Sequence, residues 1–166
     1  AEAMASFNLR YPEVRVEVHV SDRPVDLTGE RFDFPSEFTY YHRPLSSYWR
    51  AFREAGFSVE VATPTGGAVP IDDRSTPTEE QARAWRDAMP PLRDARALAD
   101  VDLARYDAIF VPGGHGAMFD LARDEGTARA ISTLFRNDRV VAAVCHGPGA
   151  LVGATDAEGR PIVAGR

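Results

Sequence analysis

A cysteine and a histidine, Cys145 and His146, stand side by side where an apolar run gives way to glycine and proline. The run Val140–Val144 is apolar throughout, which is typical of a strand buried on both faces of a parallel sheet. Gly147–Gly149 interrupts it, and the proline of this Gly-Pro-Gly segment suits the first turn of a helix. A thiol between a strand and a helix has the geometry of a nucleophile elbow, and backbone N–H groups at the helix start stabilise a thiolate. We therefore interpret Cys145 as a reactive residue rather than a buried core cysteine.

A second glycine-rich segment follows another apolar run. Asp107–Val111 is predicted to be a central strand, and Gly113 and Gly114 after it let backbone N–H groups point at a bound oxyanion. If the two strand ends share one edge of the sheet, an oxyanion hole faces the thiolate, which is the minimum for addition to a carbonyl. His146 or His115 would then act as base or proton shuttle. The alternative for His146, a ring turned away from the sulfur and hydrogen-bonded in the fold, stays open.

A carboxylate close to the thiol would complete the acid–base chemistry. Glu37 is the first candidate upstream and Glu30 the second, although solvated loop charge is the commoner fate of a single glutamate. Both lie in a long segment, 21–41, that proline and glycine punctuate, and long loops in compact domains tend to be functional. The four histidines, at positions 19, 42, 115 and 146, show no recognised ligand spacing, so we predict no metal site.

The composition limits the class of protein. The chain has 166 residues, a formal net charge of −6 and one cysteine. This length and the apolar content of 44% predict a single domain over residues 1–166 with a packed core. The acidic balance argues against a nucleic-acid partner, and no apolar run is long enough to cross a membrane. A lone cysteine cannot form an internal disulfide and there is no signal segment, so we expect a soluble, cytoplasmic protein.

Strands and helices alternate along the chain. Strict alternation of apolar and polar residues from Val14 to Val20 predicts a strand with one buried face, near an edge of the sheet. The predicted helices cover residues 45–55, 76–88 and 128–135, with a short helical piece at 92–99 and another helix after the cysteine. Further strands are expected at 57–61 and 161–164. This alternation predicts an α/β fold with a parallel sheet and helices on both faces.

Two motifs resemble those of the ThiJ/PfpI family, within the class I glutamine amidotransferase-like superfamily. They are Val-Pro-Gly-Gly-His-Gly-Ala at 111–117 and Ala-Val-Cys-His-Gly-Pro at 143–148. The resemblance covers the chain from about Leu45 to the end. It is closest to the branch that contains heat-shock chaperones of the stress response and glutathione-independent glyoxalase III enzymes. It implies a flavodoxin-like three-layer sandwich with a mostly parallel central sheet, shortened here at the C-terminus, and a homodimer.

The same resemblance implies a reaction. Cys145 would attack the aldehyde of methylglyoxal to give a hemithioacetal, and a glutamate and a histidine would move protons until D-lactate leaves, without a cofactor. Gly114, with Gly113 beside it, and the backbone of His146 would form the oxyanion hole. His115 would line the substrate pocket.

The family places its acid–base glutamate about a dozen residues before the glycine that ends the first helix. Counting back from Gly56 lands on Arg43 and Pro44, so Glu37 takes this role only if the loop or the helix is rearranged. The third acid of the family lies beyond Arg166, and the spacing of Asp156 does not match it. Two other functions therefore stay open: a chaperone-like or stress-binding protein, and a cysteine amidase or peptidase.

Overall fold

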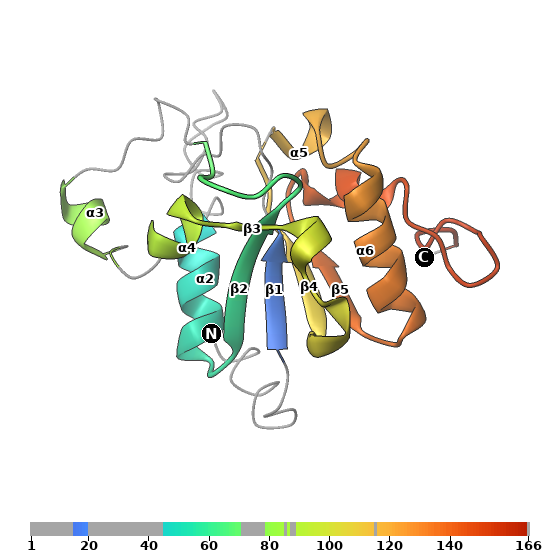
Figure 1. Cartoon of the computed structure of the whole chain (residues 1–166), viewed down its shortest axis with the longest axis horizontal. Coiled ribbons are helices and arrows are strands. Elements are labelled where there is room, and N and C mark those ends of the chain that lie inside the picture. The colour runs from blue at the N-terminus through green and yellow to red at the C-terminus, as the bar shows by residue number, and fades with distance from the viewer. Residues whose placement is uncertain are drawn as a thin grey trace.

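A five-stranded parallel sheet forms the centre of the fold (Figure 1). The computed structural model describes residues 15–19, 45–70, 79–84, 86, 89–114 and 116–165. The strand order is β3-β2-β1-β4-β5, and every neighbouring pair is parallel. The strands are β1 (Arg15–His19), β2 (Ser58–Thr63), β3 (Arg96–Ala97), β4 (Ala108–Val111) and β5 (Val140–Ala143).

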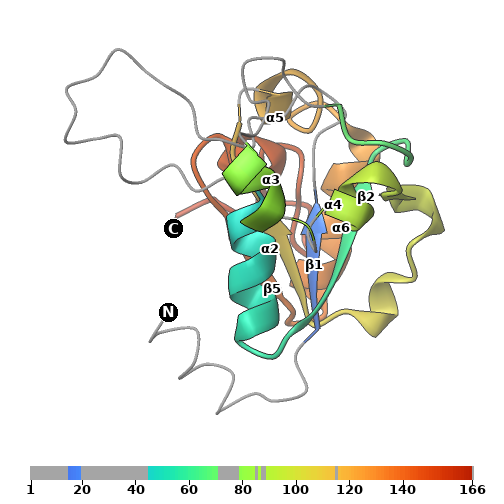
Figure 2. The ribbon, with the colours of Figure 1, turned by 90° about the vertical axis from the view of Figure 1, so that its left-hand side faces the viewer.

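Helices cover both faces of this sheet, as the alternation of elements predicts. Figure 2 shows α2 on one side of β1 and α6 on the other, which makes the three layers of an α/β sandwich. The α-helices are α2 (Leu45–Glu54), α3 (Glu79–Ala84), α4 (Met89–Arg93), α5 (Gly116–Phe119) and α6 (Glu125–Arg136). Short 3₁₀ helices are η3 (Leu98–Asp100), η4 (Leu103–Arg105) and η5 (Gly147–Leu151).

Strand β4 separates two hydrophobic cores, and all four of its side chains are buried. Phe110 faces α2, where its ring centroid lies 5.1 Å from those of Tyr48 and Phe52. Ile109 and Val111 point to the opposite face, into the core beneath α6. Because both faces of β4 are covered, the strand is apolar at every position rather than alternating.

Helix α6 begins where a carboxylate satisfies its first backbone donors. Asp124 is the N-cap, and its side chain accepts hydrogen bonds from the backbone N–H and the hydroxyl of Thr127. Such a cap stabilises a helix by about 1 kcal/mol, which explains why α6 starts three residues before the predicted 128–135 stretch. Ile131 and Leu134 then fall on the buried face and pack against β4.

Four sequence predictions about the elements are wrong. β5 is the last strand in the order and Val140 is 44% exposed, so this strand is not buried on both faces. β1 lies at the centre of the sheet between β2 and β4, not near an edge, because pairing order is set by the chain crossovers and not by alternation within one strand. The 92–99 stretch is not one helical piece: α4 ends at Arg93, and the chain then enters β3 and η3. No strand forms at 161–164, where a turn and one isolated bridge from Thr155 to Pro161 bury Ile162 instead.

A polar cluster closes the β3 side of the sheet. The Tyr106 hydroxyl donates a hydrogen bond to Glu60 Oε2 at 2.5 Å, and Arg96 Nη1 lies 3.0 Å from the same oxygen. Arg96 also donates to the carbonyl of Asp100 at 2.7 Å. The hydrogen bond from Tyr106, followed by the Arg96 guanidinium, lowers the pKa of the Glu60 carboxyl below its ordinary value. The cluster therefore favours the ionised form of Glu60 in the folded state.

Replacing Tyr106 by phenylalanine tests how much its hydrogen bond to the ionised Glu60 carboxylate stabilises the fold. Because the folded-state pKa of Glu60 is lowered, the stabilisation is present above the ordinary carboxyl pKa and is lost as the pH falls through the folded-state value. We expect Tyr106→Phe to lower the free energy of unfolding by about 1 kcal/mol at pH 7, and by less at acidic pH. Urea unfolding at a series of pH values measures the loss of unfolding free energy at neutral and at acidic pH. A substitution of the exposed Glu79, Glu79→Gln, is the control. If the loss of unfolding free energy in Tyr106→Phe stays constant down to about pH 3, the pH dependence expected here is wrong.

Candidate active site

The elbow at Cys145 is built from a residue in an unusual backbone conformation. Cys145 follows β5 after one residue and has φ of +57°, in the left-handed region that costs an L-residue about 1 kcal/mol. Two backbone hydrogen bonds flank it: Val144 N–H donates to Val111 O at 3.1 Å, and Gly147 N–H donates to Val144 O at 2.8 Å. The thiol is exposed. An exposed thiol at a strand end, on a residue with positive φ, matches the predicted elbow geometry, while its role as nucleophile stays a prediction.

His146 lies against the sulfur. Its Nδ1 atom is 3.3 Å from Cys145 Sγ, within hydrogen-bonding distance for sulfur. The His146 backbone is helical and directly precedes η5, and its carbonyl accepts a hydrogen bond from Gly149 N–H at 3.0 Å. The sequence left open whether this ring turns toward the thiol or away from it. The structure brings the two groups together, as proton transfer between them requires.

The glycine-rich turn after β4 lies beside the elbow. β4 and β5 pair in register, with Val111 opposite Ala143, so the two strand ends meet at one edge of the sheet. Gly114 has φ of +110°, a conformation that favours glycine. A Cβ atom placed on Gly113 would lie 2.4 Å from Cys145 Cβ, which shows how closely the turn approaches the cysteine. The turn also follows the point where strand order reverses, between β1 and β4, where open α/β sheets leave a crevice for ligands.

Gly147 lets the elbow pack directly on the end of β4. A Cβ atom at this position would lie 2.4 Å from Val111 O and 2.8 Å from Pro112 O. Only a glycine allows such an approach between two backbone segments. The Gly-Pro-Gly segment therefore does more than end the strand, because it sets the distance between the cysteine and the turn after β4.

Three of the candidates cannot be placed. Glu37 and His115 lie outside the described residues, as does the second glutamate candidate, Glu30. Their roles as acid–base group and substrate-pocket residue stay predictions. Among the described residues, no group of three or more histidine, cysteine or acidic side chains is arranged to hold a metal ion.

Asp156, the acid nearest to the cysteine on its C-terminal side along the chain, is engaged elsewhere. Its carboxylate accepts hydrogen bonds from the backbone and the side chain of Arg160, each at 2.9 Å, and from Glu158 N–H at 3.0 Å. These contacts close a turn at the surface. Asp156 is thus committed to local structure, in agreement with its spacing, which does not match the family's third acid.

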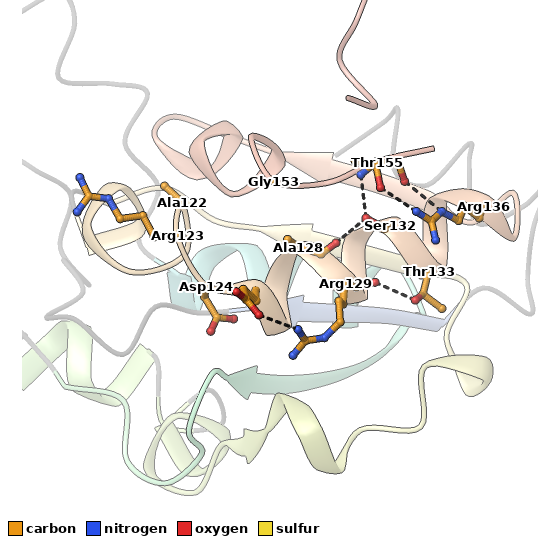
Figure 3. Close-up of a pocket in the computed structure, with 11 residues that line it drawn as sticks. Ala122, Arg123, Asp124, Ala128, Arg129, Ser132, Thr133, Arg136, Gly153 and Thr155 are labelled. Atoms are coloured by element: carbon orange, nitrogen blue, oxygen red, sulfur yellow. Dashed lines mark hydrogen bonds and ion pairs between the residues drawn. The ribbon is translucent and has the colours of Figure 1, made fainter. Parts of the chain in front are cut away.

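Sequence reasoning did not find the cavity along α6, which has a volume of about 520 Å³ (Figure 3). Neither Cys145 nor His146 lines it. Three hydroxyls line it: Ser132 donates to Ala128 O at 2.7 Å, Thr133 donates to Arg129 O at 2.8 Å, and Thr155 accepts from Arg136 at 2.7 Å. The α6 cavity is thus separate from the elbow at Cys145.

None of the helices in the described ranges has both the length and the apolar character needed to span a membrane. This finding concerns only the part of the chain that the structure describes.

Known proteins provide an independent comparison. The chain is 35% identical over 109 residues to the protein/nucleic acid deglycase HchA of Staphylococcus aureus, an alignment that covers 61% of this chain and 37% of that protein. The chain thus spans little more than a third of the curated relatives that it matches.

Solved structures show the same fold. Glyoxalase III from Candida albicans superposes with a TM-score of 0.67 at 24% identity, over 91% of this chain and 65% of that one. The Rapid Encystment Protein of Francisella tularensis gives a TM-score of 0.65 at 22% identity, over 90% of this chain and 67% of that one. Residues 44–164 match the DJ-1/PfpI family, a stretch that includes both glycine-rich strand ends. The predicted ThiJ/PfpI membership is confirmed: this chain belongs to the DJ-1/PfpI family.

Proposed function

We propose that this chain carries the nucleophile of a glyoxalase III or deglycase-type enzyme that acts on small reactive carbonyl compounds such as methylglyoxal. The observation that carries the proposal is the exposed Cys145 thiol, 3.3 Å from the His146 ring and beside a glycine turn. The names of the HchA and glyoxalase III relatives support the same class of chemistry. A homodimer in the cytoplasm remains part of the proposal.

The reaction begins with bond formation between Cys145 Sγ and the aldehyde carbon of methylglyoxal. The thiolate is the attacking species, and the carbonyl oxygen gains the negative charge. Backbone N–H groups of Gly114 and His146 would stabilise this oxyanion before it takes up a proton as the hemithioacetal hydroxyl. The exposure of the thiol leaves room for a small aldehyde to approach it.

Isomerisation and hydrolysis then complete a net addition of water to methylglyoxal. A base removes the proton from the former aldehyde carbon and an acid returns one to the neighbouring ketone carbon, which converts the hemithioacetal into a lactoyl thioester. Water cleaves the thioester, so that lactate leaves and the thiol is restored. His146 is placed to exchange protons with the sulfur, and Glu37 is our candidate for the carbon-bound proton.

A chaperone-like function is the second candidate, because apolar side chains are exposed near the elbow. On α5, Met118 is 48% and Phe119 is 68% exposed, and Val152 just after η5 is 70% exposed. Exposed apolar groups of this size are suited to binding unfolded chains. An amidase or peptidase has less support, because Asp156, the acid that the sequence offers after the cysteine, is held by Arg160.

Substitution of Cys145 tests the enzyme proposal. We expect Cys145→Ser and Cys145→Ala to lose methylglyoxal turnover, because neither side chain supplies a thiolate, while far-UV circular dichroism stays unchanged. The measurement is formation of D-lactate, detected with a stereospecific dehydrogenase. Thr133→Ala, whose exposed hydroxyl lines the α6 cavity, is the control and should retain activity. Equal turnover by wild type and both cysteine variants would rule out the mechanism.

The chaperone-like alternative has a separate readout. Suppression of the thermal aggregation of a client protein should persist in Cys145→Ala and should fall in a Phe119→Ser variant, if the exposed apolar groups act as the binding surface. An absence of suppression by the wild-type chain would remove this candidate.

The assignment of Glu37 is tested by a matched pair of substitutions. We expect Glu37→Gln to lower kcat on methylglyoxal about 100-fold or more, because a positioned general base contributes at least that factor. Glu30→Gln should leave kcat unchanged. A pH–rate profile for each variant identifies the carboxyl that titrates in the reaction. The opposite result, a loss confined to Glu30→Gln, would transfer the role to Glu30.

A further inference from the structure

The two glycines in the turn after β4 are required for different reasons. Gly114 has φ of +110°, and a Cβ atom there would meet nothing within 4 Å. Its requirement is therefore conformational. Gly113 is not among the residues with positive φ, so a side chain would not strain its backbone in that way. The requirement at Gly113 must come from its surroundings.

These surroundings are the cysteine itself. A Cβ atom on Gly113 would lie 2.4 Å from Cys145 Cβ, 3.0 Å from Cys145 Sγ and 3.2 Å from Val144 O. The Cys145 side chain thus rests directly on the open face of Gly113. On another side, the sulfur meets His146 Nδ1 at 3.3 Å. The Cys145 side chain thus contacts both the bare backbone of Gly113 and the imidazole ring of His146.

We propose that Gly113 is a positioning residue, whose missing side chain provides the seat that keeps the Cys145 sulfur against His146. Its effect on turnover rests on the proposed function, whereas the contact itself does not. The seat is fixed because the cysteine backbone cannot easily retreat. Val144 is hydrogen-bonded to Val111, and Gly147 is already packed against the end of β4. The tightest contact, 2.4 Å, would be with Cys145 Cβ, which rotation of the thiol does not move. A side chain at position 113 would therefore force the turn after β4 away from the elbow, and the sulfur would lose the surface that holds it beside the ring.

The first test compares Gly113→Ala with the wild-type chain. We expect the rate of thiol alkylation by iodoacetamide to fall several-fold, and kcat on methylglyoxal to fall about 100-fold with little change in KM, because the reacting atom is misplaced. Gly126→Ala in the first turn of α6 is the matched control, since its new Cβ would meet only the Asp124 carboxylate within 3.4 Å. Its alkylation rate and kcat should equal those of the wild type.

The second test removes the atoms that the new side chain would meet. Gly113→Ala should lower the melting temperature in the wild-type background but not in a Cys145→Gly background, where the Cβ and Sγ atoms are absent. This double-mutant cycle isolates the contact between the two positions. It also remains informative if Gly113→Ala alone folds poorly, because the double variant is expected to fold.

Either of two results would overturn the proposal that Gly113 positions the Cys145 sulfur. One is an equal loss of stability from Gly113→Ala in both backgrounds, which would assign the glycine to the backbone and not to the thiol. The other is an unchanged alkylation rate. Failure of the proposed function is distinguishable, because a wild-type chain that does not convert methylglyoxal still gives an alkylation rate and a complete stability cycle.

Discussion

The parallel pairing of β4 with β5 is the interaction on which the candidate site depends. Val111 lies opposite Ala143, and one further hydrogen bond, from Val144 N–H to Val111 O, extends this pairing beyond the strand. The strands themselves contribute no reactive group. Their register brings two segments that are more than thirty residues apart into contact, and it gives the energy that holds Cys145 at a positive φ.

Side-chain size matters as much as side-chain chemistry at this junction. The turn after β4 and the segment after β5 approach so closely that two of their glycines, Gly113 and Gly147, have no space for a Cβ atom. Cys145 and His146 lie beside these glycines, with the thiol exposed and 3.3 Å from the imidazole. The acid–base chemistry we propose therefore relies on backbone packing that is local to one edge of the sheet.

The sequence predicted the parts of this arrangement that depend on neighbouring residues. The strand before Cys145, the break at Gly147 and the glycine turn at 113–114 all have strong local signals, and their proximity followed from parallel topology. The central place of β1 was missed because pairing order is a property of the whole chain. β3 was missed because two residues are too few to show a period. Glu37 lies outside the described residues, and local sequence patterns do not indicate which carboxylate reaches the thiol.

The strain at Cys145 has a consequence for how the protein responds to warming. The residue keeps its left-handed conformation only while the flanking hydrogen bonds at Val144 and Gly147 persist. Local opening at the exposed edge strand requires less free energy than melting of the buried core around Ile109. As temperature rises, the elbow would relax first, so the local geometry around Cys145 and the global fold would have separate thermal limits.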